Sequence, residues 1–205
     1  MATWELAAKA RQDFADMIDG LSAQQLDEQS LCEEWTAKEV VAHLTSFVET
    51  GGFGLFTEMV KNRFDFTKVS AAMVDKRKDR SVADLTGSLR QHATKSAPLP
   101  TFPEELTVGD VAIHTQDVRR PLGLAGELDE KVLRTTLDFL TTHKHATTLV
   151  DRRPIEDVRL EATDLGWSFG DGPEITGTGE AIMMGLANRP VLDDLDGPGL
   201  ANWKS

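Results

Sequence analysis

The feature that most constrains the fold of this chain is a helical repeat of apolar residues that runs from residue 4 to about residue 150 and then stops. Apolar side chains recur every three to four positions in five segments, which are 4–19, 36–50, 81–96, 107–123 and 128–148. The apolar stripe of an amphipathic helix must be buried against another element. The first 150 residues are therefore predicted to form a helical bundle.

The pattern changes after Asp151. Val158, Leu160 and Ala162 alternate with polar residues, which is typical of a strand with one buried face. Two further short strands and one helix are predicted at 167–169, 174–176 and 181–187. The turn GDGP between the second and third strands favours a hairpin.

Two domains are predicted from this change in periodicity. Residues 1–150 are expected to form a helical domain, and residues 151–205 a small α/β domain, so that the fold class is α+β. A length of 205 residues is sufficient for one full domain and a small second one.

The composition excludes several classes of function. A net charge of -12 argues against a nucleic-acid partner, since phosphate binding needs clustered Lys and Arg. No apolar run approaches the ~20 residues that span a bilayer, and the N-terminus has no apolar signal segment, so a cytoplasmic protein without a membrane partner is expected. The single cysteine, Cys32, excludes an internal disulfide framework and is expected to be a small core residue rather than a nucleophile.

The segment TVGDVAIHTQDVRRPLG carries the strongest chemical signal. Asp110, His114 and Asp117 occur at positions i, i+4 and i+7, which places them within an arc of about 60° on one helix face. A carboxylate and an imidazole one turn apart can bind one cation, with zinc, nickel or iron as the ions that suit them. The alternative is that Asp110 only stabilises the N-terminus of its helix.

Other histidines have competing interpretations. His43 lies between Val40 and Phe47 on the apolar stripe of segment 36–50, where a hydrogen-bonded core histidine is commoner than a ligand. His143 and His145 are spaced like a metal-binding pair, but at a helix C-terminus two histidines more often complement the dipole.

Three stretches resemble one known family. SLCEEWTAKEVVAHL is similar to the N-terminal signature of the mycothiol-dependent maleylpyruvate isomerase family, and GDVAIHTQDVRRPLG to its second signature. DLGWSFGDGPEITGTGEAIMMGLANRP resembles the small C-terminal domain of that family. The resemblance covers nearly the whole chain in order, and it implies a DinB-like four-helix bundle followed by a small α/β domain.

The resemblance also implies a metal site. The family binds one divalent ion through a histidine of the second helix and an acid–histidine pair of a later helix, which correspond to His43, Asp110 and His114. The characterised isomerase of the family has glutamate where this chain has Asp110, so the ligand is shorter here by one methylene. Asp117, one turn after His114, is expected to orient an imidazole or to act as a fourth ligand.

The activity that the resemblance implies is thiol-dependent. The chain is expected to use a divalent metal, zinc before nickel or iron, with mycothiol or a similar thiol as cosubstrate, for isomerisation of or S-transfer to a small electrophile. No side chain is assigned as a catalytic acid or base. The alternative is a non-catalytic metal- or thiol-binding module, a sensor or a storage protein. The protein is expected to be a monomer or a homodimer.

Anionic groups on such ligands would need positive charge near the metal. We expect the open side of the site to face the C-terminal domain and Arg119, Arg120 and Arg189 to form an anion-binding wall. Each arginine could instead only neutralise the dipole at the end of its helix.

Overall fold

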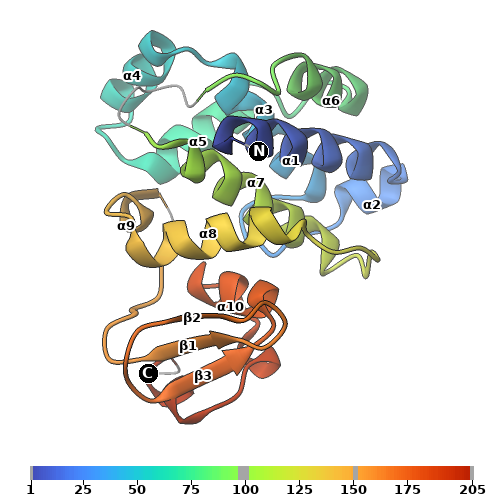
Figure 1. Cartoon of the computed structure of the whole chain (residues 1–205). Helices are drawn as coiled ribbons and strands as arrows, with labels where there is room; N and C mark the ends of the chain where they lie inside the picture. Colours follow the sequence, from blue (N-terminus) through green and yellow to red (C-terminus); the bar gives the residue numbers. More distant parts are fainter. Residues whose placement is uncertain (1, 97–101, 150–151, 204–205) are drawn as a thin grey trace. The chain divides into compact units, whose positions relative to one another are not determined.

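The computed structural model describes residues 2–96, 102–149 and 152–203 (Figure 1). It contains two compact units, Met1–Ala125 and Gly126–Ser205, which are described separately. The fold class is α+β, as predicted, with a helical bundle followed by a small three-stranded sheet. No helix within the described ranges combines the length and the apolar character needed to cross a bilayer.

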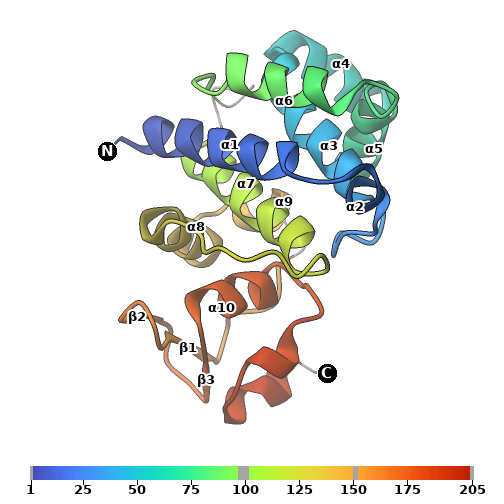
Figure 2. The ribbon, with the colours of Figure 1, turned by 90° about the vertical axis from the view of Figure 1, so that its right-hand side faces the viewer.

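Four helices close into a ring in the first unit. They are α1 (Thr3–Asp19), α3 (Ala37–Glu49), α6 (Val82–Gln91) and α7 (Glu104–Arg119). Helix α1 packs against α6 and α7, and α3 packs against the same two helices, so the ring order is α1–α6–α3–α7. Figure 2 shows α1 between α6 and α7. This arrangement encloses one interior toward which all four apolar stripes are directed.

The helix starts follow from the capping residues in the sequence. At the start of α3, Thr36 Oγ1 accepts from the Glu39 N–H at 3.3 Å, while Glu39 Oε2 accepts from the Thr36 N–H at 2.9 Å. The hydroxyl oxygen of Ser22 likewise accepts from the Gln25 N–H at the start of the short helix α2 (Ala23–Asp27), and that of Ser81 accepts from the Asp84 N–H at the start of α6. These bonds satisfy backbone donors that a helix leaves unpaired.

Two helices connect α3 to α6. Helix α4 (Gly52–Lys61) and helix α5 (Phe66–Asp75) enclose a small apolar cluster. The cluster consists of Leu55, Val69 and Met73, with Phe47, Met59 and Phe102 packed against it. The charged sequence AMVDKRKDR at 72–80 predicts an exposed connection. This prediction is wrong for its first part, because α5 continues to Asp75 and buries Met73.

Some other helical expectations also need correction. The apolar spacing in segment 4–19 predicts a core position for Trp4. This prediction is wrong, because Trp4 lies in the first turn of α1 and is 48% exposed. Helix α6 ends at Gln91 rather than at residue 96. The Ser88 carbonyl in its last turn accepts from the His92 N–H at 3.0 Å and lies 2.9 Å from His92 Nδ1.

The second unit begins with α8 (Glu130–Thr142) and α9 (Ala146–Leu149), so the helix expected over 128–148 is broken at His143. The sheet contains β1 (Arg159–Ala162), β2 (Trp167–Phe169) and β3 (Glu174–Gly177), followed by α10 (Gly179–Leu186). Two 3₁₀ turns, Leu192–Asp194 and Pro198–Asn202, end the described chain. Leu160 and Ile175, side by side in the parallel pair β1–β3, are fully buried.

The predicted hairpin between the second and third strands is wrong. The strand order is β2–β1–β3, with β1 antiparallel to β2 and parallel to β3. The GDGP turn carries the chain past the start of β1 instead. A Cβ on Gly170 would lie 2.3 Å from the Val158 carbonyl oxygen, and one on Gly172 would lie 2.6 Å from the Asp157 oxygen. Glycine is required there by the close backbone approach.

The boundary between domains depends on the criterion. The change of periodicity separates 1–150 from 151–205, whereas packing separates the units between Ala125 and Gly126. The difference arises because the apolar face of α8 packs against α10 within the second unit. The division by element type stays a prediction.

Candidate metal centre

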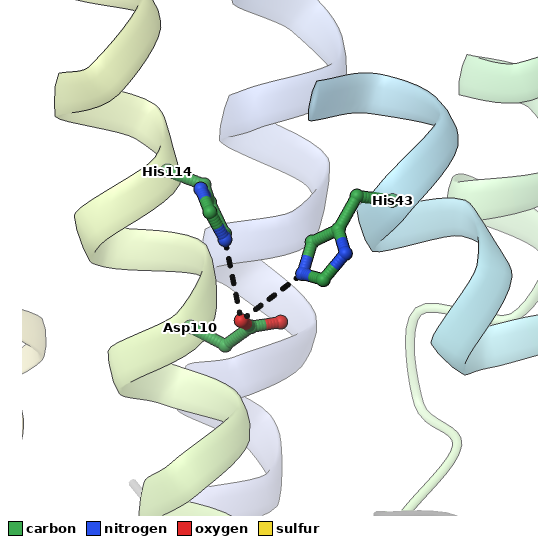
Figure 3. Close-up of side chains that lie close together, drawn as sticks. All are labelled: His43, Asp110 and His114. Atoms are coloured by element: carbon green, nitrogen blue, oxygen red, sulfur yellow. Dashed lines mark ion pairs between the residues drawn. The ribbon is translucent and has the colours of Figure 1, made fainter. Parts of the chain in front are cut away.

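Three side chains converge inside the four-helix ring. Helix α7 carries Asp110 and His114 one turn apart, and α3 presents His43 from the facing side (Figure 3). The two imidazoles are buried, with 5% of His43 and 7% of His114 exposed, while Asp110 is partly exposed. All three therefore form one polar spot inside the ring, and Asp110 leaves it open on one side.

The distances in this cluster suit a shared cation. Asp110 Oδ1 lies 3.5 Å from His43 Nε2 and 3.6 Å from His114 Nε2. These separations are too long for good hydrogen bonds. Two ligand atoms bound tetrahedrally to one zinc ion lie about 3.4 Å apart. One ligand atom from each residue lies within 4.8 Å of the other two. The donor set and these separations fit one zinc-like ion.

The electrostatics favour the protonation states that a metal site needs. Burial lowers the pKa of His43 below its ordinary value, even though Asp110 opposes this. Burial alone would raise the pKa of Asp110, but His43 beside it, with the charges of His114 and Arg11, lowers that pKa below its ordinary value. A neutral imidazole and an ionised carboxylate, the forms that coordinate metals, are thereby favoured at neutral pH.

Asp117 fixes the orientation of one imidazole. Its side chain is fully buried, and Oδ2 lies 2.9 Å from His114 Nδ1. An ionised carboxylate only accepts hydrogen bonds, so Nδ1 carries the proton and donates it. This tautomer leaves the lone pair on Nε2, the nitrogen that faces Asp110. His43 has no equivalent support, since its buried Nδ1 has no hydrogen-bond partner among the described residues.

An indole covers the two histidines. The ring centre of Trp35 lies 4.4 Å from that of His43 and 5.8 Å from that of His114. The segment before α3 is rigidly tied: Ser30 Oγ donates to the Trp35 carbonyl at 2.6 Å, and the Leu31 N–H donates to the Asp117 carbonyl at 2.9 Å. Trp35 therefore forms an apolar wall of the site and excludes water from that side.

The predicted arginines lie at helix ends. Arg119 ends α7, with Nη1 3.4 Å from Gln116 Oε1, and Arg120 follows it. Arg119 is nine residues beyond Asp110, so it projects from about the opposite side of the helix. Arg189 belongs to the second unit, where Nη1 donates to the Ala187 carbonyl at 3.1 Å. Their role as an anion-binding wall stays a prediction.

Sequence reasoning missed two residues of this region. The sequence of residues 30–35 predicts only a connector, although Trp35, an aromatic residue directly before a helix with an inward histidine, was a usable signal. Arg11, only 4% exposed, was also missed. It lies four residues after Ala7 and three before Phe14, so a charged residue occupies the core stripe of α1. By contrast, His143 stacks between Phe139 and His145, in the second unit.

Fold and cluster define a class of protein: a helical bundle with two histidines and one carboxylate converging in its interior, joined to a small α/β unit. The family model described as the mycothiol maleylpyruvate isomerase N-terminal domain matches residues 7–119, more than half of the chain. The chain therefore belongs to this family. No curated protein sequence matches it.

Two solved structures are similar over nearly the whole length. The crystal structure of the mycothiol-dependent maleylpyruvate isomerase has a TM-score of 0.62 at 15% identity, covering 96% of this chain and 91% of that one. A histidine-to-alanine mutant of the isomerase matches with a TM-score of 0.62 at 14% identity and the same 96% and 91% coverage. At these identities the similarity establishes the shared fold.

Proposed function

We propose that this protein is a divalent-metal-dependent enzyme that uses mycothiol or a similar small thiol to isomerise, or to transfer sulfur to, a small electrophile. The observation that carries the proposal is the convergence of His43, Asp110 and His114 at distances that fit one shared ion. Membership in the family supports the thiol-dependent class of reaction.

His43, Asp110 and His114 would hold the ion, with zinc preferred over nickel or iron for two imidazoles and one carboxylate. When bound, such an ion lowers the pKa of a coordinated thiol, so that the thiolate forms at neutral pH. Three protein ligands are the number found in catalytic rather than structural zinc sites.

The chain's own residues prepare the site in three ways. Asp117 holds the proton on His114 Nδ1 and thereby directs Nε2 toward the ion. The Trp35 indole keeps water from one side of the histidines, which strengthens charge interactions within the site. Asp110, the most exposed of the three ligands, marks the side from which thiol and substrate would enter.

The test is turnover of maleylpyruvate by the zinc-loaded protein, followed by absorbance, with mycothiol present or omitted. We expect turnover to require both the ion and the thiol and to disappear in His43→Ala. A matched control is His92→Ala, which removes a histidine that contacts Ser88 on α6 and no residue of the cluster. If metal and thiol bind without any turnover of this or related electrophiles, the protein is a non-catalytic binding module and the enzymatic proposal fails.

A further inference from the structure

Arg11 is a buried cation without an ionic partner among the described residues. Its side chain lies in the core stripe of α1, and Nη1 donates to the carbonyls of Ala93 and Lys95 at 2.6 and 2.7 Å. No carboxylate in the described ranges forms a salt bridge with it. Nε and Nη2 have no hydrogen-bond acceptor within the same part of the chain. Two carbonyls therefore fix the guanidinium while its other donors remain available.

Such a group is costly to keep in a bundle core. A buried charge loses hydration, which the two carbonyls and the more distant charges of Asp110 and Glu104 replace only in part. Burial lowers the pKa of Arg11, although the guanidinium stays protonated. Groups retained at such a cost are concentrated at functional sites.

Arg11 lies on α1, which packs against α7, the helix that carries Asp110 and His114. The charges that act on it are those of Asp110, one of the three ligands, and Glu104, in the first turn of α7. Helix α1 passes behind Asp110 in Figure 3 and packs against α7. Glu104 Oε2 is likewise buried without a partner among the described residues. The polar spot therefore extends from the ligands toward α1.

Metal binding changes the charge balance at this point. In the metal-free protein Asp110 partly compensates Arg11. An ion held by His43, Asp110 and His114 would take up that carboxylate and add positive charge, which leaves Glu104 as the remaining negative charge that acts on Arg11. A rigid guanidinium with free donors then attracts an anion, and its fork geometry matches a carboxylate.

We propose that Arg11 is the anion-binding residue of this metal centre and receives a carboxylate group of the bound ligand. The inference rests on the proposed function in two respects: an ion is bound at the site, and the ligand carries a carboxylate. It differs from the wall of Arg119, Arg120 and Arg189, because Arg11 is buried in the bundle and Arg119 projects from about the opposite side of α7.

The test is calorimetric titration of the zinc-loaded full chain with maleate, a simple dicarboxylate. Arg11→Met should weaken maleate binding roughly 10- to 100-fold, the loss expected for a charge-assisted hydrogen-bonded pair. Zinc affinity, measured by competition with a chelator, should stay the same or increase, because a positive charge near the ion is removed. Arg11→Lys keeps the charge without the fork and should give intermediate maleate affinity.

Arg90→Met is the matched control, since Arg90 also joins α6 to α1 but does so through Asp16 and Asp19 on the surface. Unchanged maleate affinity in Arg11→Met, equal losses in Arg90→Met, or parallel loss of zinc and maleate would overturn the inference. If Arg11→Met does not fold, Arg11→Lys decides by the same criteria. If the wild-type protein binds no zinc, the proposed function fails; maleate binding to the metal-free chain that depends on Arg11 would still support the inference, and its absence would refute it.

Discussion

Replacing Asp117 by asparagine tests how the bundle prepares His114 as a ligand. The asparagine side chain is similar in size and could still accept the Nδ1 proton through its amide oxygen, so Asp117→Asn removes charge while it preserves shape. The bond that changes is 2.9 Å long and fully buried on the carboxylate side. A charge-assisted hydrogen bond of this kind contributes roughly 1.5–3 kcal/mol, twice as much as a neutral one.

Losing half of that contribution corresponds to roughly a 3- to 12-fold fall in metal affinity and losing all of it to roughly a 12- to 140-fold fall. These values overlap the roughly 10- to 100-fold range typical of carboxylates that support metal-bound histidines. The assay is zinc competition against a chromophoric chelator at pH 7, with thermal unfolding of the metal-free protein measured in parallel. Asp19→Asn is the control, because Asp19 accepts from Thr86 and touches no residue of the cluster. Wild-type zinc affinity in Asp117→Asn would refute the view that Asp117 supports the ligand.

Three further predictions concern residues around the bundle. Burial would raise the pKa of Glu49, but Ser88, Arg80 and Arg77 lower it from 4.5 to about 2. At about 1.4 kcal/mol per pH unit, this shift contributes about 3 kcal/mol to the free energy of unfolding, which is present above pH 4.5 and is lost as the pH falls toward 2. Glu49→Gln should therefore make the free energy of unfolding, measured with urea, depend less on pH in this range. Co²⁺ should quench a larger share of the tryptophan fluorescence in the wild-type protein than in Trp35→Phe, because among the four tryptophans Trp35 has its ring centre 4.4 Å from that of His43. Equal fractional quenching would contradict the Trp35 wall. Cys32→Ser should retain thiol-dependent turnover in the maleylpyruvate assay, since the nucleophile is supplied by the cosubstrate, and loss of activity with intact folding would show otherwise.

Two local rules explain which parts of the candidate metal site could be predicted from the sequence. Spacing of four along one helix brings Asp110 and His114 onto the same face, and a histidine on an apolar stripe points inward. The capping residues Thr36 and Ser81 likewise set helix starts through contacts between residues three apart. The identity of the partner helices came from the family resemblance, since spacing along one helix says nothing of its neighbours.

Features that depend on distant contacts were not predictable in this way. The GDGP turn has hairpin chemistry, yet close backbone packing of Gly170 and Gly172 on the start of β1 directs the third strand to the other edge of the sheet. Arg11 interrupts the apolar stripe of α1, but the role that we propose for it depends on the charge of Asp110, which is distant in the sequence. The apolar repeat of α8 predicts that it belongs to the helical domain 1–150, whereas its packing places it in the second unit.

The most direct test of the metal centre is the zinc content of the protein after exhaustive loading with Zn²⁺ and removal of excess ion, measured by elemental analysis beside X-ray absorption at the zinc edge. We predict one ion per chain with two imidazoles and one carboxylate among its ligands, and its loss in His43→Ala, Asp110→Ala and His114→Ala, each folded as judged by circular dichroism. Zinc retained at full stoichiometry in these variants, or none bound by the wild-type chain, would contradict the assignment.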